Sequence, residues 1–229
     1  MFPSSSRKAV VLLSGGLDSA TTLYLAKAGG YRCHALILDY GQRHRKEVLA
    51  ARRIARAARV PFQLLRLRFP WGGSALTDRS ISVPVGRSLA RIGRGIPPTY
   101  VPARNTIFLS LALAYAEAIG AQTVFIGANA VDFSGYPDCR PSFYRAMQKV
   151  FRAGTRAGVN GRTIRIATPL IRMTKAQIIR LGKKLGVPYE LTWSCYQGRS
   201  GPCGRCDSCL IRAKGFRESR SPDPAGTFC

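Results

Sequence analysis

The string Ser14-Gly15-Gly16-Leu17-Asp18-Ser19 has the residue types and spacing of a site that holds phosphates. Its two glycines let the backbone approach a polyanion closely, and the free N–H groups and dipole of a following helix favour negative charge. Ser14 and Ser19 add hydroxyl donors, and Asp18 can hold the Mg²⁺ that neutralises phosphates. The string lacks the Lys of a Walker loop and the third Gly of a dinucleotide fingerprint. It therefore predicts another kind of phosphate loop, with a plain glycine turn as the alternative.

A second group of reactive residues lies near the C-terminal end, where four of the seven cysteines fall at positions 195, 203, 206 and 209. Cysteines grouped in this way are typical of a reducing compartment and a metal site rather than a disulfide framework. Four thiolates, from Cys195, Cys203, Cys206 and Cys209, suit tetrahedral Zn²⁺ and leave no position for a catalytic water. We therefore expect one structural zinc site. An iron–sulfur cluster or a redox pair is the alternative.

The elements that must position these groups follow an alternating pattern. Apolar strand-like runs alternate with helical segments, which predicts right-handed crossovers and a parallel sheet flanked by helices in an α/β, Rossmann-like domain. The expected strands are 8–13, 33–38, 62–67, 123–126 and 163–167. The expected helices are 18–28, 44–58, 104–119, 142–153 and 174–185, the last opened by Thr174 as N-cap. Lys175, beside that cap, is a candidate phosphate contact.

The chain divides at about residue 190. Residues 1–189 carry the strand and helix pattern, whereas 190–229 read as an irregular, cysteine-rich tail that binds metal because it has little apolar core of its own. Within the first part, segment 71–102 is rich in Gly, Ser and Pro and is too long for an idle connection. It is a candidate substrate loop, as is the polar and aromatic segment 128–141.

Composition limits the classes of function. Hydrophobic residues make up 46% of the sequence, and no apolar stretch reaches the roughly 20 residues that cross a bilayer, so no membrane contact is expected. The first eight residues do not form a signal peptide, which predicts a cytoplasmic protein. The formal charge of +25 arises from 36 Lys and Arg against 11 Asp and Glu. Such a surface attracts anionic small molecules or nucleic acid, and charge alone does not separate the two.

The residue string 14–19 resembles the PP-loop of the N-type ATP pyrophosphatases, and further motifs make the chain similar to the 7-cyano-7-deazaguanine synthase family nearly from end to end. The motifs that carry this resemblance are Gly72-Gly73-Ser74-Ala75-Leu76-Thr77, Tyr100-Val101-Pro102-Ala103-Arg104-Asn105, Gly127-Ala128-Asn129, Asp132-Phe133-Ser134-Gly135-Tyr136-Pro137-Asp138-Cys139-Arg140 and Thr192-Trp193-Ser194-Cys195.

The resemblance implies conversion of 7-carboxy-7-deazaguanine and ammonia into 7-cyano-7-deazaguanine, in the queuosine and archaeosine precursor pathway. ATP would be cleaved between its α- and β-phosphates and would adenylate first the acid and then the amide. No covalent enzyme nucleophile is needed. The residues that the resemblance assigns to ATP are Leu13, Ser14, Gly15, Gly16, Leu17, Asp18, Ser19, Ala20, Thr21, Thr22, Leu23 and Lys175, with Asp18 and Ser19 acting in catalysis together with Arg104.

The resemblance also assigns residues to the deazaguanine. Arg104 would contact a carboxylate or phosphate, Asp132 and Asp138 would accept hydrogen bonds from purine-like N–H groups, and Asn105 and Tyr136 would complete the substrate site. Ordinary structural roles remain the alternative, because Arg104 can simply decorate a helix start and an Asp can form an Asx-turn. A homodimer is also expected. Nucleic-acid contact is left open but is not required for this chemistry.

Two competing functions share some of these features. A tRNA sulfurtransferase has the PP-loop and is favoured by the basic charge, but the sequence lacks the usual RNA-binding extension and its cysteines suit a closed metal site. A zinc-containing nucleic-acid binder that uses the loop as a nucleotide sensor would bind ATP without turning it over.

Overall fold

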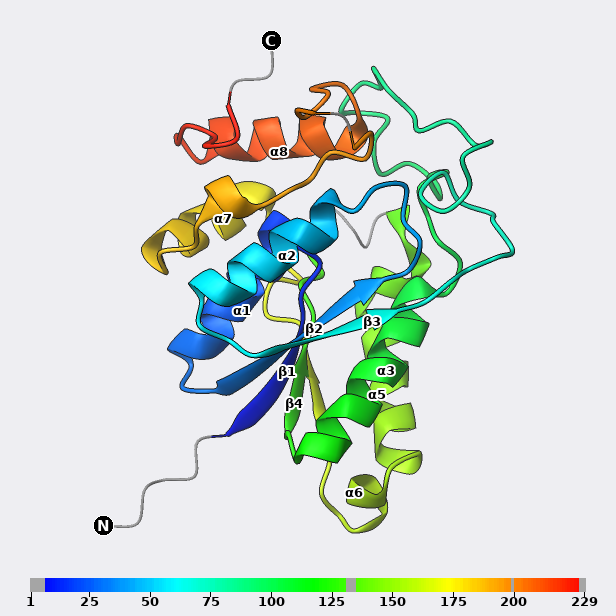
Figure 1. The fold of residues 1–229 in the computed structure, drawn as a ribbon, viewed down its shortest axis with the longest axis vertical. Helices are drawn as coiled ribbons and strands as arrows, with labels where there is room; N and C mark the ends of the chain where they lie inside the picture. The colour runs from blue at the N-terminus through cyan, green and yellow to red at the C-terminus, as the bar shows by residue number, and fades with distance from the viewer. Residues whose placement is uncertain (1–6, 131–134, 199, 227–229) are drawn as a thin grey trace.

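The computed structural model describes residues 7–130, 135–198 and 200–226 of the 229-residue chain. One five-stranded sheet lies between two layers of helices (Figure 1). Its strands are β1 Lys8–Leu12, β2 Arg32–Asp39, β3 Phe62–Arg66, β4 Thr123–Phe125 and β5 Arg165–Ala167. All pairings are parallel and the order is β3-β2-β1-β4-β5. The predicted α/β class and all five predicted strands are confirmed.

The strands form where the sequence is continuously apolar because both faces of the sheet are covered. Successive side chains point to opposite faces of the sheet. Ala9 and Val11 therefore join one core with the helices of residues 17–28, 46–57 and 175–184, whereas Val10 and Leu12 join a second core with the helices of residues 104–119 and 141–153. Val10 and Val11 are both fully buried. This double burial fixes the register of β1 and therefore the position of the loop that follows it.

The five predicted helices are present close to their expected bounds, and two further helices among the described residues, at 156–159 and 207–218, were not predicted. The helices are α1 Leu17–Ala28, α2 Lys46–Ala57, α3 Arg104–Ile119, α5 Pro141–Ala153, α6 Arg156–Val159, α7 Lys175–Lys184 and α8 Asp207–Glu218, with short 3₁₀ turns at Pro137–Cys139 and Tyr189–Leu191. The predicted N-cap is confirmed, because Thr174 and Gln177 form a reciprocal capping box at the start of α7. None of these helices is both long and apolar enough to cross a bilayer.

The prediction that the tail is irregular is wrong. Residues 207–218 form α8, a twelve-residue helix that packs beside α7 (Figure 1). Its buried residues are Asp207, Cys209, Arg212, Gly215 and Phe216. Only one of these is a large apolar residue, so the hydrophobic periodicity that reveals most helices was missing from the sequence.

The tail is held by contacts other than its cysteines. Phe216 packs edge-on against Tyr189, with ring centroids 5.7 Å apart, and belongs to the same core as α1 and α7. Arg212 is 3% exposed and pairs with Asp223 at 2.8 Å. The domain boundary near residue 190 stays a prediction, although the two sides of it share this core.

The long segment between β3 and α3 contains no helix or strand, and it leans on the start of α8 (Figure 1). Val85 pairs with Cys206 in an isolated antiparallel bridge, and Arg87 forms an ion pair with Asp207. Ala75 and Val83 are buried against Cys195, Cys206 and Cys209. The predicted substrate loop and the cysteine segment therefore form one packed unit.

Candidate active site

A cavity of about 260 Å³ opens at the carboxyl ends of β1, β2 and β4. Parallel α/β sheets place ligands at this edge, where the strand order reverses, and here the reversal lies between β1 and β4. The sequence-predicted residues that line the cavity are Leu13, Ser14, Gly16, Leu17, Asp18, Ser19, Arg104, Asn105, Tyr136 and Lys175. The loop 71–102 contributes Leu76 and Thr99 to the same wall.

The phosphate loop is closed by its own two serines. The Ser19 hydroxyl donates to the Gly16 carbonyl at 3.0 Å and accepts from the Ser14 N–H at 3.2 Å, with the two hydroxyl oxygens 3.0 Å apart. No side chain among the described residues caps the N-terminus of α1. The first N–H groups of this helix are therefore available to an anion.

Position 15 can be occupied only by glycine, because of its backbone conformation and its close contact with α2. The φ of Gly15 is +86°, in the left-handed region that favours glycine, and a Cβ at this position would lie 2.2 Å from the Glu47 carbonyl oxygen. The first turn of α2 thus packs directly on the phosphate loop. Any side chain at position 15 would push α2 away from it.

Asp18 and Lys175 meet in the cavity although 157 residues separate them in the chain. The Lys175 ammonium donates to both Asp18 carboxylate oxygens, at 2.8 and 2.6 Å, and the Asn129 amide donates to the same carboxylate at 3.1 Å. The side chains are 13% and 21% exposed for Lys175 and Asp18. The pair places one ammonium group and one carboxylate beside the open end of α1.

The remaining predicted ATP residues lie behind the loop. The side chains of Ala20, Thr21, Thr22 and Leu23 are fully buried and do not line the cavity. The Thr21 hydroxyl donates to the Leu17 carbonyl and lies 2.8 Å from the Tyr189 hydroxyl. These four residues fix α1 in the core, whereas Gly15 shapes the loop backbone.

Arg104 opens α3 and faces the cavity. The residue before it, Ala103, has a φ of +53° and no side chain that can cap the helix. Burial alone would lower the pKa of the Arg104 guanidinium, but Tyr40, Cys139 and Asp138 outweigh it and hold that pKa above its ordinary value. Arg104 is therefore a permanent cation in the cavity wall.

Asp138 has a structural role that the sequence did not reveal. One of its carboxylate oxygens accepts the Asn105 backbone N–H at 2.9 Å, and so caps α3 in place of Ala103. The Asn105 amide donates to the Asp138 carbonyl at 3.0 Å and to the Cys139 sulfur at 3.2 Å. Asp138 is 5% exposed and does not line the cavity. Its predicted substrate contact stays a prediction, and Asp132 lies outside the described residues.

Glu47 and Tyr40 are cavity residues that the sequence reasoning missed. Burial raises the pKa of the Glu47 carboxyl to about 7, while the Arg104 cation opposes the rise and the Cys195 thiol adds to it. Burial likewise raises the pKa of the Tyr40 hydroxyl to about 12, against the effect of Arg104. The sequence did not point to Glu47 because this residue lies in the first turn of an Arg-rich amphipathic helix, α2, which was interpreted as a solvated basic surface.

We expect Glu47 to make the ligand-free protein less stable as pH rises from about 4.5 to about 7. In that window the unfolded chain has lost the Glu47 proton and the folded chain keeps it, so folding is progressively opposed. Between these pH values the free energy of unfolding should fall by up to about 3 kcal/mol because of Glu47. Glu47→Gln cannot titrate at this position, so the fall that Glu47 causes should be absent from the variant. Urea unfolding of both proteins at pH 5 and pH 7.5 measures the difference. The expectation would be contradicted if the free energy of unfolding changed equally with pH in the wild-type protein and in Glu47→Gln.

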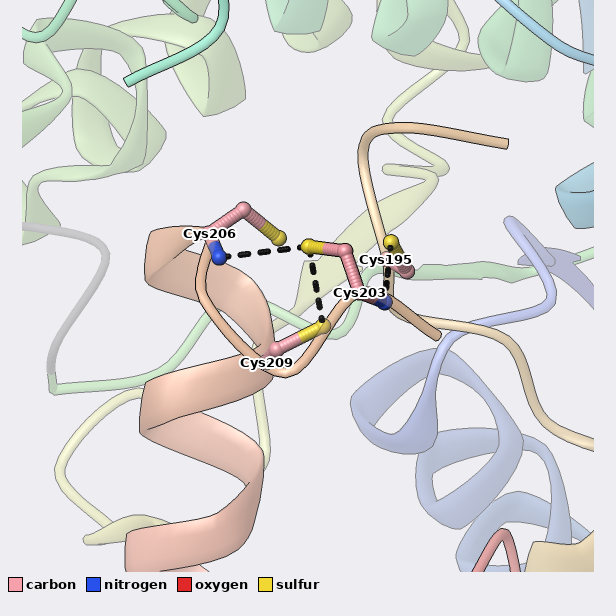
Figure 2. Close-up of side chains that lie close together, drawn as sticks. All are labelled: Cys195, Cys203, Cys206 and Cys209. Atoms are coloured by element: carbon pink, nitrogen blue, oxygen red, sulfur yellow. Dashed lines mark hydrogen bonds between the residues drawn. The ribbon is translucent and has the colours of Figure 1, made fainter. Parts of the chain in front are cut away.

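The four predicted cysteines meet at one point, between the segment that follows the 3₁₀ turn Tyr189–Leu191 and the first turn of α8 (Figure 2). Their sulfur atoms all lie within 4.8 Å of one another, and three of the four residues are buried. A tetrahedral ion bound at about 2.3 Å from each sulfur needs sulfurs roughly 3.8 Å apart, so the cluster fits a single metal ion. The Cys203 and Cys206 backbone N–H groups each donate to a cluster sulfur at 3.3 Å, which suits thiolates.

The cysteine cluster connects to the phosphate loop through Trp193 and Arg212. The Arg212 guanidinium donates to the Thr192 hydroxyl at 2.7 Å and the Ser194 hydroxyl at 3.3 Å. Between those two residues, the Trp193 backbone N–H donates to the Gly15 carbonyl at 3.0 Å. The segment that leads into Cys195 is therefore hydrogen-bonded directly to the loop that would hold phosphates, so a shift of this segment would move the loop.

The family model described as "Queuosine biosynthesis protein QueC" matches residues 8–220 of this chain. A 7-cyano-7-deazaguanine synthase of Anaeromyxobacter dehalogenans is 57% identical over 224 residues, which are 96% of this chain and 96% of the relative. A 7-cyano-7-deazaguanine synthase of Nostoc punctiforme is also 57% identical, over 95% of this chain and 98% of the relative.

Solved structures of more distant proteins share the fold. NMN synthetase from Francisella tularensis superposes with a TM-score of 0.50 at 14% identity, over 94% of this chain and 87% of that chain. A 4-thiouridine synthetase, solved with RNA and bound ATP, superposes with a TM-score of 0.50 at 21% identity, over 95% of this chain and 51% of that chain. At these identities the likeness establishes the architecture alone.

Proposed function

This chain belongs to the family of the queuosine biosynthesis protein QueC, and from that premise we propose that it converts 7-carboxy-7-deazaguanine and ammonia into 7-cyano-7-deazaguanine with consumption of ATP. The observation that supports this most directly is one cavity that holds both the Ser14–Ser19 loop and Arg104. The loop would bind the triphosphate of ATP, and Arg104 would bind the carboxylate of the substrate. The close relatives named as synthases make the sulfurtransferase alternative the weaker one.

The first half of the reaction is activation of the acid. The substrate carboxylate attacks the α-phosphate of ATP, forming an acyl adenylate and releasing pyrophosphate. The N–H groups at the start of α1, the Ser14 hydroxyl and the Lys175 ammonium bind the departing phosphates, where negative charge develops. Asp18 would hold Mg²⁺, which would neutralise that charge and release Lys175 from its present pairing. Ammonia then attacks the acyl carbon, AMP leaves, and a proton is lost to give the amide.

The second half repeats the same chemistry on the amide. Its oxygen attacks the α-phosphate of a second ATP and pyrophosphate leaves again. The adenylated oxygen then departs as AMP while nitrogen loses its remaining protons, which leaves the carbon–nitrogen triple bond. Each step uses the phosphate loop and Arg104, and no bond to the enzyme is needed. Cys139, whose sulfur already accepts the Asn105 amide, is not required as a nucleophile.

We also propose that the cysteine cluster holds one Zn²⁺ with a structural role. Four thiolates complete a tetrahedral shell and leave no site for water, so the ion supplies rigidity rather than chemistry. The cluster lies beside the cavity wall formed by Trp193 and Ser194, which explains why an enzyme of this class would keep a closed metal site next to its substrate.

The decisive experiment incubates the purified protein with Mg²⁺, ATP, ammonium and 7-carboxy-7-deazaguanine. Mass spectrometry should find the nitrile, and nucleotide analysis should find two AMP and two pyrophosphate per nitrile formed. Omission of ammonium should leave the acid activated and no nitrile. ADP and phosphate as the nucleotide products would contradict the proposed cleavage, and ATP binding without turnover would support the nucleotide-sensor alternative.

A further inference from the structure

The cavity has two ends of different chemistry. The phosphate end is formed by Ser14, Asp18, Ser19 and Lys175. The aromatic end is formed by Tyr40, Phe108, Tyr136 and Tyr196, with Tyr40 and Phe108 packed edge-on at 5.4 Å between ring centroids. Aromatic walls suit a flat heterocycle, which gains contact area from ring packing. The aromatic end is therefore the place for the deazapurine ring.

Glu47 lies beside both ends. Its backbone carbonyl touches the phosphate loop at Gly15, and its carboxyl group interacts electrostatically with Arg104 and Tyr40 of the aromatic end. Two acidic residues line the cavity among those described, Asp18 and Glu47. The Asp18 oxygens are already engaged by Lys175 and Asn129. Glu47 is one of the residues that line the cavity, and among the described residues no donor hydrogen-bonds to its carboxyl group, so its oxygens have acceptor capacity to spare.

A partly buried carboxylate without donors is costly, and a ligand that brings donors removes that cost. The pyrimidine edge of a deazaguanine presents two adjacent donors, the ring N–H and the 2-amino group, at a spacing that matches the two oxygens of one carboxylate. Arg104, of opposite charge, matches the carboxylate on the other ring of the same molecule. The negative Glu47 thus matches the N–H groups on one edge of the substrate, and the positive Arg104 matches the carboxylate on the opposite edge.

We propose that Glu47 determines substrate specificity by accepting both N–H groups of the 2-amino-oxopyrimidine edge, while Arg104 holds the carboxylate that reacts. This inference rests on the proposed function and names the recognition element within it. It assigns to Glu47 the acceptor role that the family resemblance implied for Asp132 and Asp138; the Asp138 carboxylate caps α3.

The test compares the carboxy-deazaguanine with the analogue that lacks the 2-amino group. The wild-type protein should prefer the amino compound by about 100-fold in kcat/KM, because a site built for a donor is left with an unpaired acceptor when the donor is missing. In Glu47→Gln the preference should fall to about 10-fold or less, through a higher KM for the amino compound rather than a lower kcat. Glu47→Asp, which keeps the carboxylate, should retain more of the preference. Glu218→Gln, a surface control, should retain all of it.

Equilibrium binding of the two compounds to each protein, measured without ATP, separates this inference from the proposed function. If the wild-type protein makes no nitrile, the function fails, whereas the binding preference still tests Glu47. If nitrile is made but Glu47→Gln discriminates as well as the wild-type protein, the inference is overturned and the function stands. A variant that changes only the KM for ammonium would also overturn it, since Glu47 would then act on ammonia.

Discussion

Asp18→Asn is expected to lower kcat at least about 100-fold while the protein stays folded, since loss of one electrostatic contact to a developing charge typically costs that much. The substitution keeps the shape of the side chain and its contact with Asn129, but removes the charge that would hold Mg²⁺ and that now pairs with Lys175. Steady-state turnover at saturating ATP measures the effect. Loss of the partly exposed ion pair should cost only about 1 kcal/mol, or a Tm shift of no more than about 4 °C.

Glu218→Gln is the matched control for Asp18→Asn. It also removes a carboxylate from a lysine pair, with Lys214 at 3.7 Å, but at a site where both side chains are nearly half exposed. Its turnover and Tm should equal those of the wild-type protein. Asp18→Asn with wild-type turnover would refute the metal-holding role, and an unfolded variant would show that Asp18 serves stability first.

Cys206→Ser is expected to reduce bound metal from about one ion per chain to a small fraction of that, and to abolish most of the nitrile-forming activity. Structural Zn²⁺ contributes roughly 10–16 kcal/mol of apparent binding energy in small peptide sites, whereas burial of Phe216, the large apolar residue of the buried face of α8, contributes about 1.5–3 kcal/mol. Without metal the segment 193–212 should loosen. The contact of Trp193 with Gly15 would be lost, and with it the shape of the phosphate loop.

Metal analysis, limited proteolysis and circular dichroism together test this expectation. Proteases should cut the Cys206→Ser tail, while the strands and helices before residue 190 keep their signal. Cys33→Ala removes a buried thiol from β2, outside the cluster, and should keep both metal and a resistant tail. A metal-free protein with full activity and an intact tail would end this account of the cysteines.

Much of the fold followed from local signals. The strands were predictable because a parallel sheet covered on both faces needs continuous apolar runs, and β1 has one in Ala9–Leu12. The phosphate loop was predictable because its glycines and serines are contiguous in sequence. The cysteines were predictable for the same reason, since three of them follow one another at three-residue intervals.

The features that the sequence hid depend on long-range contacts. Lys175 reaches Asp18 across 157 residues. Asp138 caps α3 through the Asn105 N–H, 33 residues before it, because Ala103 cannot. Glu47 was hidden by its Arg-rich helix, although its packing on Gly15 brings it to the cavity. Helix α8 was missed because an arginine and a glycine occupy its buried face, and the Arg212 charge is balanced by Asp223 rather than by water.

The hydrogen bond from Trp193 to Gly15 also bears on the order of events during synthesis. Ribosomes add about 5–20 residues per second, so the roughly 180 residues between these two positions take about 10–35 s to make. Throughout that interval the emerging chain carries a phosphate loop whose last partner has not been translated. A nascent or truncated chain lacks this hydrogen bond, so under the proposed function its use of ATP would await translation of the segment around Trp193.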